Sequence, residues 1–358
     1  MNVYYLDENL KGSFTAGFKA PSDIAAICKK LGFNRIEMPY IRHYKNKILD
    51  KAETVIKFTF FWIKLLMTFP KDSVLIYQHP TLGKRLAPKF LTKLCNKKDR
   101  KVVCLIHDLE SLRGGVAGLM SVSENYESQE FTLLGKMDYI ICHNDKMKEV
   151  LVKKGIDENK LVSLQIFDYL TDCPINENKC SKDTICVAGN LAPGKAGYIY
   201  DLFADPDKCS IKANLYGNYF ENKGNEDMIY KGSFKPDEVP GVLEGSFGLV
   251  WDGNTASTCG GNTGEYLRYN NPHKTSLYLA SGIPVIVWSE AAMSGFVSEN
   301  HVGIAVKSLY EIEEKVNAIS DADYKEMKDN AIAVSAKLRS GYYFETAIKT
   351  VLDKIDNK

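Results

Sequence analysis

Residues 247 to 295 combine an apolar strand, a polar loop and a helix start in an arrangement suited to binding an anion. The strand ends in Trp251-Asp252-Gly253, and Asn271-Pro272-His273-Lys274-Thr275 opens an apolar helix. Asn271 is a favourable N-cap and Pro272 a favourable first helical residue, so the next residues are expected where backbone N–H groups and the positive end of the helix dipole point outward. We therefore expect Asp252, His273, Lys274 and Thr275 to border a phosphate site.

A second cation is expected beside another helix start. Residues 185 to 191 predict a strand that runs into a tight turn at Gly189-Asn190, and Lys195 follows near the start of a helix. Two helix starts with a lysine each would suit a diphosphate. The alternative for Lys195 is a solvated side chain after a turn. Tyr216, which ends a further strand, would either stack on a base or pack at the rim of the sheet.

The segment Gly12-Ser13-Phe14-Thr15-Ala16-Gly17 follows the first strand as a flexible turn. It lacks the G-x-G-x-x-G spacing of a dinucleotide site, and the chain has no G-x-x-x-x-G-K-[ST] sequence. NAD and P-loop chemistry are therefore disfavoured. We expect Thr15 and Gly17 to border a ligand cleft, with Thr15 as a hydrogen-bonding residue.

Polar residues follow three apolar strands of the first half, as Gln78-His79-Pro80, His107-Asp108 and His143-Asn144. In a parallel sheet all three would face the same crevice, although a histidine at a strand end can equally be a capping or packing residue. The segment 107 to 113 adds Glu110 and Arg113, and a carboxylate there could deprotonate a substrate hydroxyl. Alternatively, Asp108 caps the following segment and Arg113 pairs with a carboxylate.

These residues are carried by two runs of alternating strands and helices, which predict parallel sheets covered on both faces. The expected strands of the first run are 3–6, 35–38, 74–77, 102–106 and 139–142, with helices near 21–31, 50–68, 82–96, 126–135 and 145–154. The expected strands of the second run are 184–188, 214–216, 228–230, 247–251, 284–288 and 303–306, before a last helical stretch over about 322–356. The pattern breaks near residue 168, so we expect domains over 1–168 and 169–330 and a C-terminal helix over 331–358 that packs back toward the N-terminal domain.

Composition excludes several classes. With 358 residues, 45% of them hydrophobic and 25% charged, the chain is globular and long enough for two domains. Nine cysteines without a Cys-x-x-Cys pair lie mostly in apolar strands, which favours free buried thiols over disulfides or zinc. Six histidines show no metal-ligand spacing, so we expect no metal site and a diphosphate bound by lysines and helix termini.

Residues 82 to 101 hold eight basic residues and one acid, with Leu and Phe at helical spacing. This segment would either touch anionic lipid headgroups or form a crossover helix with a solvated outer face. No apolar run is long enough to span a bilayer, and the chain shows no secretion signal. We expect a cytoplasmic protein, with the inner face of the membrane as an optional contact and no nucleic-acid partner.

The second half resembles a known family. Its pattern is carried by Ala188-Gly189-Asn190 with the later lysine, Tyr230-x-Gly232 followed by Pro236-Asp237-Glu238-Val239-Pro240, Gly248-Leu249-Val250-Trp251, and the segment from Asn271 to Val287. These motifs are similar to those of GT-B glycosyltransferases, especially the bacterial glucosyltransferase 3 group, which extends O-linked GlcNAc on serine-rich adhesins, and its galactofuranosyltransferase relatives. This chain departs from the group by a Gly/Asn/Thr-rich insertion over 253–269.

The resemblance implies an α/β GT-B fold with two Rossmann-like doubly wound domains facing a cleft. It implies a UDP-sugar donor in the C-terminal domain, an acceptor approached from the N-terminal domain, no obligatory metal, inversion at the transferred carbon and a homo-oligomer. Carried onto this sequence, Lys274 and His273 would bind the diphosphate together with Lys195, Tyr216 would pack on the uridine, and Thr15 would border the phosphates. We expect Asp108 to be the general base, with Glu110 as second candidate and His107 orienting it.

The leading hypothesis is therefore a metal-independent, inverting transfer of a hexose, of the beta-glucosyltransferase type, from a UDP-sugar to a hydroxyl of a glycan, glycoprotein or lipid-linked saccharide. A galactofuranosyltransferase of polysaccharide synthesis that uses UDP-galactofuranose is the first alternative. A UDP-sugar epimerase, which needs no acceptor, and a non-catalytic subunit that binds a nucleotide sugar are the others.

Overall fold

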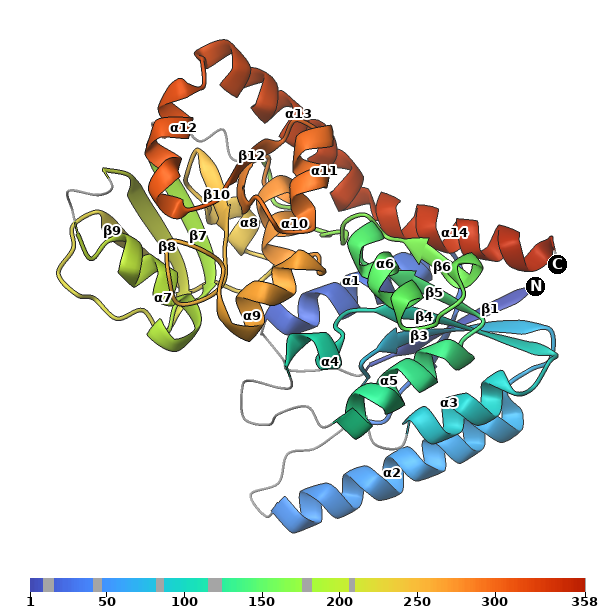
Figure 1. The fold of residues 1–358 in the computed structure, drawn as a ribbon. Coiled ribbons are helices and arrows are strands. Elements are labelled where there is room, and N and C mark those ends of the chain that lie inside the picture. Colours follow the sequence, from blue (N-terminus) through green and yellow to red (C-terminus); the bar gives the residue numbers. More distant parts are fainter. Residues whose placement is uncertain are drawn as a thin grey trace. The chain divides into compact units, whose positions relative to one another are not determined.

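The computed structural model describes residues 1–8, 16–40, 47–81, 87–114, 124–175, 182–205 and 210–357. The chain divides into two compact units, each with its own parallel sheet (Figure 1). The first unit contains the opening strand, Gly17–Leu164 and Phe344–Lys358, and the second contains Gln165–Tyr343. The chain passes into the second unit after Leu164 and returns to the first at Phe344.

The sheet of the first unit has six parallel strands in the order β2-β1-β3-β4-β5-β6. The strands are β1 (Asn2–Asp7), β2 (Asn34–Glu37), β3 (Ser73–His79), β4 (Arg100–Ile106), β5 (Tyr139–Cys142) and β6 (Leu161–Ser163). Every residue of β3 and β5 is buried, as expected for central strands of a sheet covered on both faces. The order reverses between β1 and β3, which makes their carboxyl ends a topological switch point.

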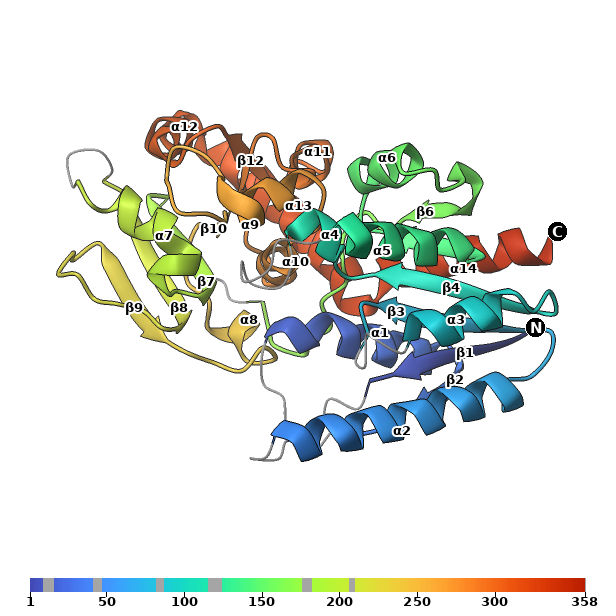
Figure 2. The same ribbon diagram turned by 60° about the horizontal axis from the view of Figure 1, so that its bottom comes forward.

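Helices connect these parallel strands, because a parallel pair requires a crossover. They are α1 (Lys19–Lys30), α2 (Lys47–Thr68), α3 (Ala87–Cys95), α4 (Glu110–Arg113), α5 (Glu124–Lys136), α6 (Asp145–Lys153) and, from the end of the chain, α14 (Tyr342–Asp356), with short 3-10 turns η1 (Ala16–Phe18) and η3 (Glu158–Lys160). The helices α2 and α3 lie side by side on the outside of this unit in both ribbon views (Figures 1 and 2).

The second unit repeats this plan, with the strand order β12-β11-β10-β7-β8-β9 and parallel pairing throughout. Its strands are β7 (Thr184–Asn190), β8 (Lys212–Asn218), β9 (Met228–Gly232), β10 (Phe247–Val250), β11 (Val285–Trp288) and β12 (Gly303–Val306). Counted from β7, this is the order 3-2-1-4-5-6 of dinucleotide-binding sheets, and its switch point lies between β7 and β10.

The helices of the second unit are α7 (Pro193–Leu202), α8 (Val239–Val242), α9 (Gly261–Glu265), α10 (His273–Ala280), α11 (Met293–Glu299), α12 (Ile312–Ala318) and α13 (Asp321–Ser340), with 3-10 turns η5 (Tyr266–Arg268) and η6 (Leu309–Glu311). The insertion over 253–269 is not an open loop, because α9 and η5 occupy its second half. Ala256 at its start is held by hydrogen bonds from Leu309 N and to Asp201.

The structure confirms each expected strand, with ends that differ by at most two residues. The three-residue strand β6 was not expected, because it is too short to show a period of its own. The last helical stretch is two helices: Gly341 adopts a left-handed backbone with φ of +83°, which ends α13 before α14 begins. The helix α13 belongs to the second unit and most of α14 to the first.

The seven cysteines within the described ranges are all free, and Cys28, Cys104, Cys142, Cys186 and Cys259 are buried. Burial raises the pKa of the Cys142 thiol to about 12, which keeps it protonated at neutral pH. These thiols act as small hydrophobic side chains, as the sequence predicted.

Candidate functional site

The switch point of the second unit brings the ends of β7 and β10 together, and these strands carry the predicted phosphate-binding residues. The strand β7 ends in Gly189-Asn190 and leads to α7, on which Lys195 occupies the first turn. The strand β10 leads directly to Trp251 and Asp252. Ligands of open parallel sheets bind at such a point, outside the carboxyl ends of the strands.

Three charged side chains meet there. The Lys195 ammonium lies 3.0 Å from Oδ1 of Asp252, and the Lys274 ammonium lies 3.8 Å from the same oxygen. Lys274 also donates a hydrogen bond of 3.2 Å to the carbonyl of Trp251, at the end of β10. All three side chains keep part of their surface exposed. The cluster carries one net positive charge, and both lysines remain within reach of an anion.

Glycine permits this close arrangement. Gly189 has φ of +139°, and a Cβ added there would lie 3.4 Å from Cε of Lys274. Gly253 has φ of +115°, and a Cβ there would come within 2.7 Å of the carbonyl oxygen of Gly260. The positive φ disfavours a side chain at both positions, and at Gly253 the available space excludes one as well.

The helix that carries Lys274 begins one residue later than the sequence predicted. Pro272 is the N-cap, with an extended ψ of 131°, so His273 and Lys274 occupy the first two helical positions. Asn271 does not cap the helix, because its side chain donates to the carbonyl of Gln165 at 3.1 Å. The N–H of Thr275 is bonded to the Pro272 carbonyl at 2.9 Å, which leaves the amides of the first two positions pointing out of the helix end.

Other predicted binding residues lie in different surroundings. His273 packs between the rings of Phe167 and Tyr169, at centroid distances of 6.0 and 5.3 Å. Thr275 is fully buried, and its hydroxyl has no hydrogen-bond partner among the described residues. Tyr216 is only 2% exposed, and its hydroxyl accepts a hydrogen bond from Glu244 N at 2.9 Å. The Tyr216 ring is therefore buried in the core rather than packed at an open rim.

The remaining predicted binding residues are Asn190, Gly17 and Thr15. Asn190 is exposed and its side chain accepts a hydrogen bond of 2.9 Å from Ala192 N, which shapes the turn before α7. Gly17 is exposed in η1, with open space where a Cβ would project. Thr15 lies outside the described residues.

In the first unit, the carboxyl ends of β3, β4 and β5 lie at one edge of the sheet, as predicted from the polar residues that follow them. Nε2 of His107 lies 2.6 Å from the amide oxygen of Gln78. The side chain of His143 is fully buried and bonds to the backbone of Ile106 and His107. Burial lowers the pKa of His143 to about 3, so this ring is neutral and has a packing role.

Asp108 is the most accessible of the predicted catalytic carboxylates. It forms an ion pair of 2.8 Å with Arg113, and both side chains are about one-third exposed. The predicted alternative is therefore half right: the carboxylate and Arg113 do pair, but Leu109 rather than Asp108 is the N-cap of α4. Glu110 is buried at 6% exposure, so Asp108 is better placed to meet a substrate.

Glu130 is a buried carboxylate of this region that sequence reasoning missed. It accepts backbone N–H bonds from Glu110 and Ser111, a hydroxyl bond from Ser111, and a contact of 2.9 Å from Nε2 of His79. Burial acts to raise its pKa, but the bonds from His79 and Ser111 outweigh burial and lower it below its ordinary value. Glu130 therefore holds the segment after Asp108. Its separation from His79 in sequence left no local signal.

Within the described ranges, no three His, Cys, Asp or Glu side chains are grouped so that they could hold a metal ion.

Comparison with known proteins places the chain in a family. The model of the glucosyltransferase 3-like N-terminal domain matches residues 3–166, and that of the C-terminal domain matches residues 185–351. The chain is 36% identical to beta-1,6-galactofuranosyltransferase WbbI of Escherichia coli (strain K12) over 265 residues. This aligned region covers 72% of this chain and 73% of WbbI. It is 24% identical over 347 residues to glucosyltransferase 3 of Streptococcus gordonii, with coverages of 94% and 93%.

Solved structures support the same fold. Anabaena Alr3699/HepE, determined in complex with UDP, superposes with a TM-score of 0.56 at 12% identity and covers 100% of both chains. The two six-stranded parallel sheets and the strand order at each switch point agree with a GT-B enzyme. The chain is therefore a glycosyltransferase with the GT-B fold and belongs to the glucosyltransferase 3-like family.

Proposed function

We propose that this glycosyltransferase moves a hexose from a UDP-sugar to a hydroxyl of a glycan or glycoconjugate, with inversion and without an obligatory metal. The observation that supports the proposal most strongly is the convergence of Lys195 and Lys274 on Asp252 at the switch point of the second sheet. A diphosphate that enters there meets two ammonium groups and the outward amides at the start of α10. Asp252 would hold the lysines in position while the donor is absent.

We propose that the reaction is a single displacement. In a single displacement, the acceptor oxygen forms a bond to the anomeric carbon while the bond from that carbon to the diphosphate oxygen breaks. The acceptor proton passes to a carboxylate, and we propose Asp108 for this role because it is the partly exposed carboxylate at the edge of the first sheet. Arg113, which pairs with Asp108 at 2.8 Å, would hold this carboxylate in position. The departing negative charge stays with UDP, where the lysines stabilise it.

The second candidate for the donor is UDP-galactofuranose instead of UDP-glucose. The identity of 36% to the galactofuranosyltransferase WbbI, against 24% to glucosyltransferase 3, favours this alternative. Incubation of the enzyme with each UDP-sugar and a panel of acceptors separates the two candidates, because only the cognate donor should release UDP faster when an acceptor is added.

Thermal unfolding with and without UDP tests the donor site. We expect UDP to raise the melting temperature of the wild-type protein by several degrees, since a ligand at about 100 times its Kd stabilises by about 2.7 kcal/mol. Lys274→Ala and Lys195→Ala should each lose most of this shift. Lys325→Ala, which removes an exposed lysine of α13, is the matched control and should keep it. Equal shifts in all four proteins would contradict the proposed phosphate site.

Turnover of the variants tests the catalytic step. Asp108→Asn should retain the UDP-dependent shift but lose about 10²- to 10⁴-fold in transfer rate, the usual contribution of a general base. Transfer by the wild-type enzyme should persist in the presence of a chelator. A strict requirement for added magnesium would overturn the metal-independent part of the proposal, and undiminished turnover by Asp108→Asn would remove Asp108 from its role.

A further inference from the structure

The outward face of α2 carries an apolar stripe between residues 49 and 67. Five large side chains at helical spacing are exposed on it, and we call them the α2 stripe: Leu49, Ile56, Phe60, Ile63 and Met67. Phe60 is 71% and Met67 77% exposed. With Val55, this one helix carries six of the sixteen large hydrophobic side chains exposed in the described ranges. Such clustering marks an interaction surface, whereas single exposed residues are ordinary.

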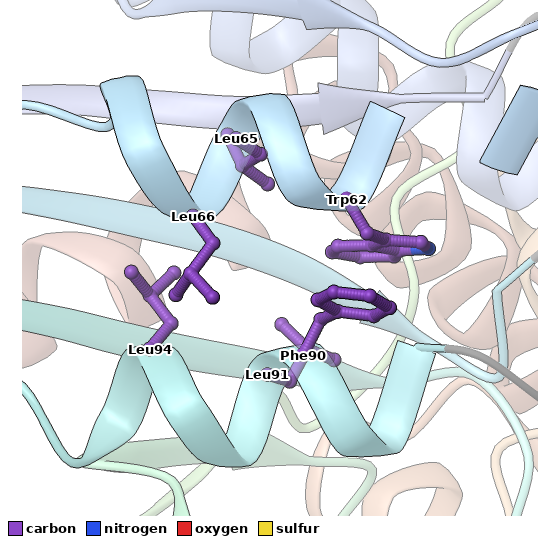
Figure 3. A pocket seen from close by; sticks show the side chains of 6 residues that line it. All are labelled: Trp62, Leu65, Leu66, Phe90, Leu91 and Leu94. Carbon is purple, nitrogen blue, oxygen red and sulfur yellow. The ribbon is translucent and has the colours of Figure 1, made fainter. Parts of the chain in front are cut away.

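The opposite face of α2 is already used for packing within the first unit. Phe58, Trp62 and Leu65 are buried there. Between α2 and α3 a narrow apolar crevice is lined by Trp62, Leu65, Leu66, Phe90, Leu91 and Leu94, and the rings of Trp62 and Phe90 stack at 6.4 Å (Figure 3). The core and α3 therefore account for the inner side chains of α2 and leave the stripe outside.

Lysines lie beside the stripe. Lys57 and Lys64 lie three and four residues from Phe60 on one side of it, where Lys57 is ion-paired with Glu53, and Lys89 and Lys93 are exposed on the neighbouring α3. Together α2 and α3 contain six lysines and two acids. Residues 1–170 hold 27 Lys and Arg against 19 Asp and Glu, whereas the rest of the chain is acidic. An apolar stripe edged by lysines complements a surface that is apolar inside and anionic outside.

We propose that the α2 stripe and the lysines of α2 and α3 form a docking surface for a bilayer of anionic phospholipids. The helix lies in the plane of the interface, the stripe enters between the headgroups, and the lysines contact lipid phosphates. Among the helices of the described ranges, none has the length and apolar character needed to cross a membrane. Lipid contact by residues 82–101 was one of two alternatives from the sequence, and we place its apolar part on α2 instead.

Charge favours lipid over a second copy of this chain. A two-fold contact through the stripe would bring the same patch of each copy together, so the lysines beside Phe60 would face those of the other copy. Like charges that meet in this way disfavour association, whereas lipid phosphates have the opposite sign.

Flotation of the full-length protein with vesicles tests the proposal. Binding is expected to vesicles of phosphatidylglycerol and phosphatidylcholine, to weaken as salt is raised, and to be absent with phosphatidylcholine alone. Phe60→Ser with Met67→Ser, and separately Lys89→Glu with Lys93→Glu, should each lower the partition coefficient by about tenfold or more. Each pair is exposed, so circular dichroism and the melting temperature should match the wild type.

Matched variants elsewhere serve as controls. Val152→Ser with Ile332→Ser removes two exposed apolar side chains outside α2, and Lys136→Glu with Lys153→Glu makes the same charge change on other helices of the first unit. Both should bind vesicles as the wild type does. Absence of wild-type binding to anionic vesicles, or equal losses in the controls, would overturn the proposal.

Light scattering tests the competing occupant. If Phe60→Ser with Met67→Ser converts an oligomer to a monomer while vesicle binding is absent, the stripe is an interface between copies and the lipid proposal is wrong. Transfer to a soluble acceptor should be unchanged in every variant, so failure of docking and failure of the proposed function remain distinguishable.

Discussion

At the scale of single residues, the same residue type takes different roles at neighbouring strand ends. His107 contacts Gln78 near the surface, His79 contacts the buried carboxylate of Glu130, and His143 is enclosed among backbone carbonyls. Three similar sequence signals therefore correspond to one histidine beside the candidate base, one that helps to fix Glu130 and one that packs in the core. Burial, which the strand pattern alone does not supply, decides between these roles.

His143 should make the first unit sensitive to acid. Its pKa is lowered by burial to about 3, below the ordinary value of 6.5, so between these values the unfolded chain binds a proton that the folded chain does not. The free energy of unfolding is therefore unaffected by this group above pH 6.5, and it decreases as the pH falls from 6.5 toward 3. At about 1.4 kcal/mol per pH unit, the loss from pH 7 to pH 5 is about 2 kcal/mol.

Urea unfolding followed by Trp62 fluorescence, with Trp251 and Trp288 replaced by Phe, measures this loss. Over the same pH interval, the free energy of unfolding should fall less in His143→Gln than in the protein that keeps His143. The difference should be about 2 kcal/mol, because Gln does not titrate. Identical pH slopes for the two proteins would show that the burial of His143 does not govern the acid response.

At the scale of elements, one tyrosine joins α10 to two strands. Tyr278 is fully buried, its hydroxyl accepts a hydrogen bond of 2.8 Å from Ala188 N of β7, and its ring fills the space above Gly248 of β10. A Cβ at Gly248 would lie 2.1 Å from Cγ of Tyr278. The position of Lys274 thus depends on a residue one helical turn later and on a glycine in the sheet.

Gly248→Ala should therefore destabilise the second unit by about 1–3 kcal/mol, the usual range for overpacking a core, and reduce the UDP-dependent rise in melting temperature. Gly295→Ala is the control, because nothing lies within 4 Å of a Cβ at this helical position. It should be neutral or stabilise by about 0.5–1 kcal/mol. Thermal unfolding of both variants, with and without UDP, measures the stability and the UDP-dependent shift. A Gly248→Ala protein as stable as Gly295→Ala would refute the packing argument.

At the scale of the whole molecule, the C-terminal helices belong to different units. The helix α13 packs on α10, and Ser335 and Arg339 both donate hydrogen bonds to the carbonyl of Ala280. The helix α14 instead buries Phe344, Ile348 and Val351, and Tyr139 of β5 donates to the carbonyl of Lys354 near its end. The last residues of the chain therefore complete the core of the unit with which the chain begins.

Ile348→Ala should destabilise the first unit by about 2–5 kcal/mol, because it leaves a cavity under α14. Hydrogen exchange read by mass spectrometry should show faster exchange in β4 and β5 and little change in β10 and β11, since each unit has its own core. Thr350→Ala, on the exposed side of the same helix, should change neither the stability of the first unit nor the exchange rates. Equal acceleration in both sheets would mean that the two units unfold together.

Local periodicity was sufficient for much of the fold. The runs at 102–106, 139–142 and 284–288 are apolar throughout, so their strands could be placed without tertiary information. The start of α10 was misplaced by one residue, because Asn271 uses its amide for Gln165, which lies far away in the sequence. Tyr216 also shows this limit: it was expected at a strand end but lies two residues before the end of β8, and its burial depends on the segment that contains Glu244.

The sequence by itself determined the two runs of strands and helices, the free thiols and the identity of the lysines beside each helix start, since these follow from residue type and spacing along the chain. Only the tertiary structure decided that Lys195 and Lys274 share Asp252, that Glu130 holds the segment after Asp108, and that the exposed apolar surface lies on α2. The physical reason is that strand order brings β7 beside β10 and determines which face of each helix is covered. Both are set by packing between residues far apart in the chain.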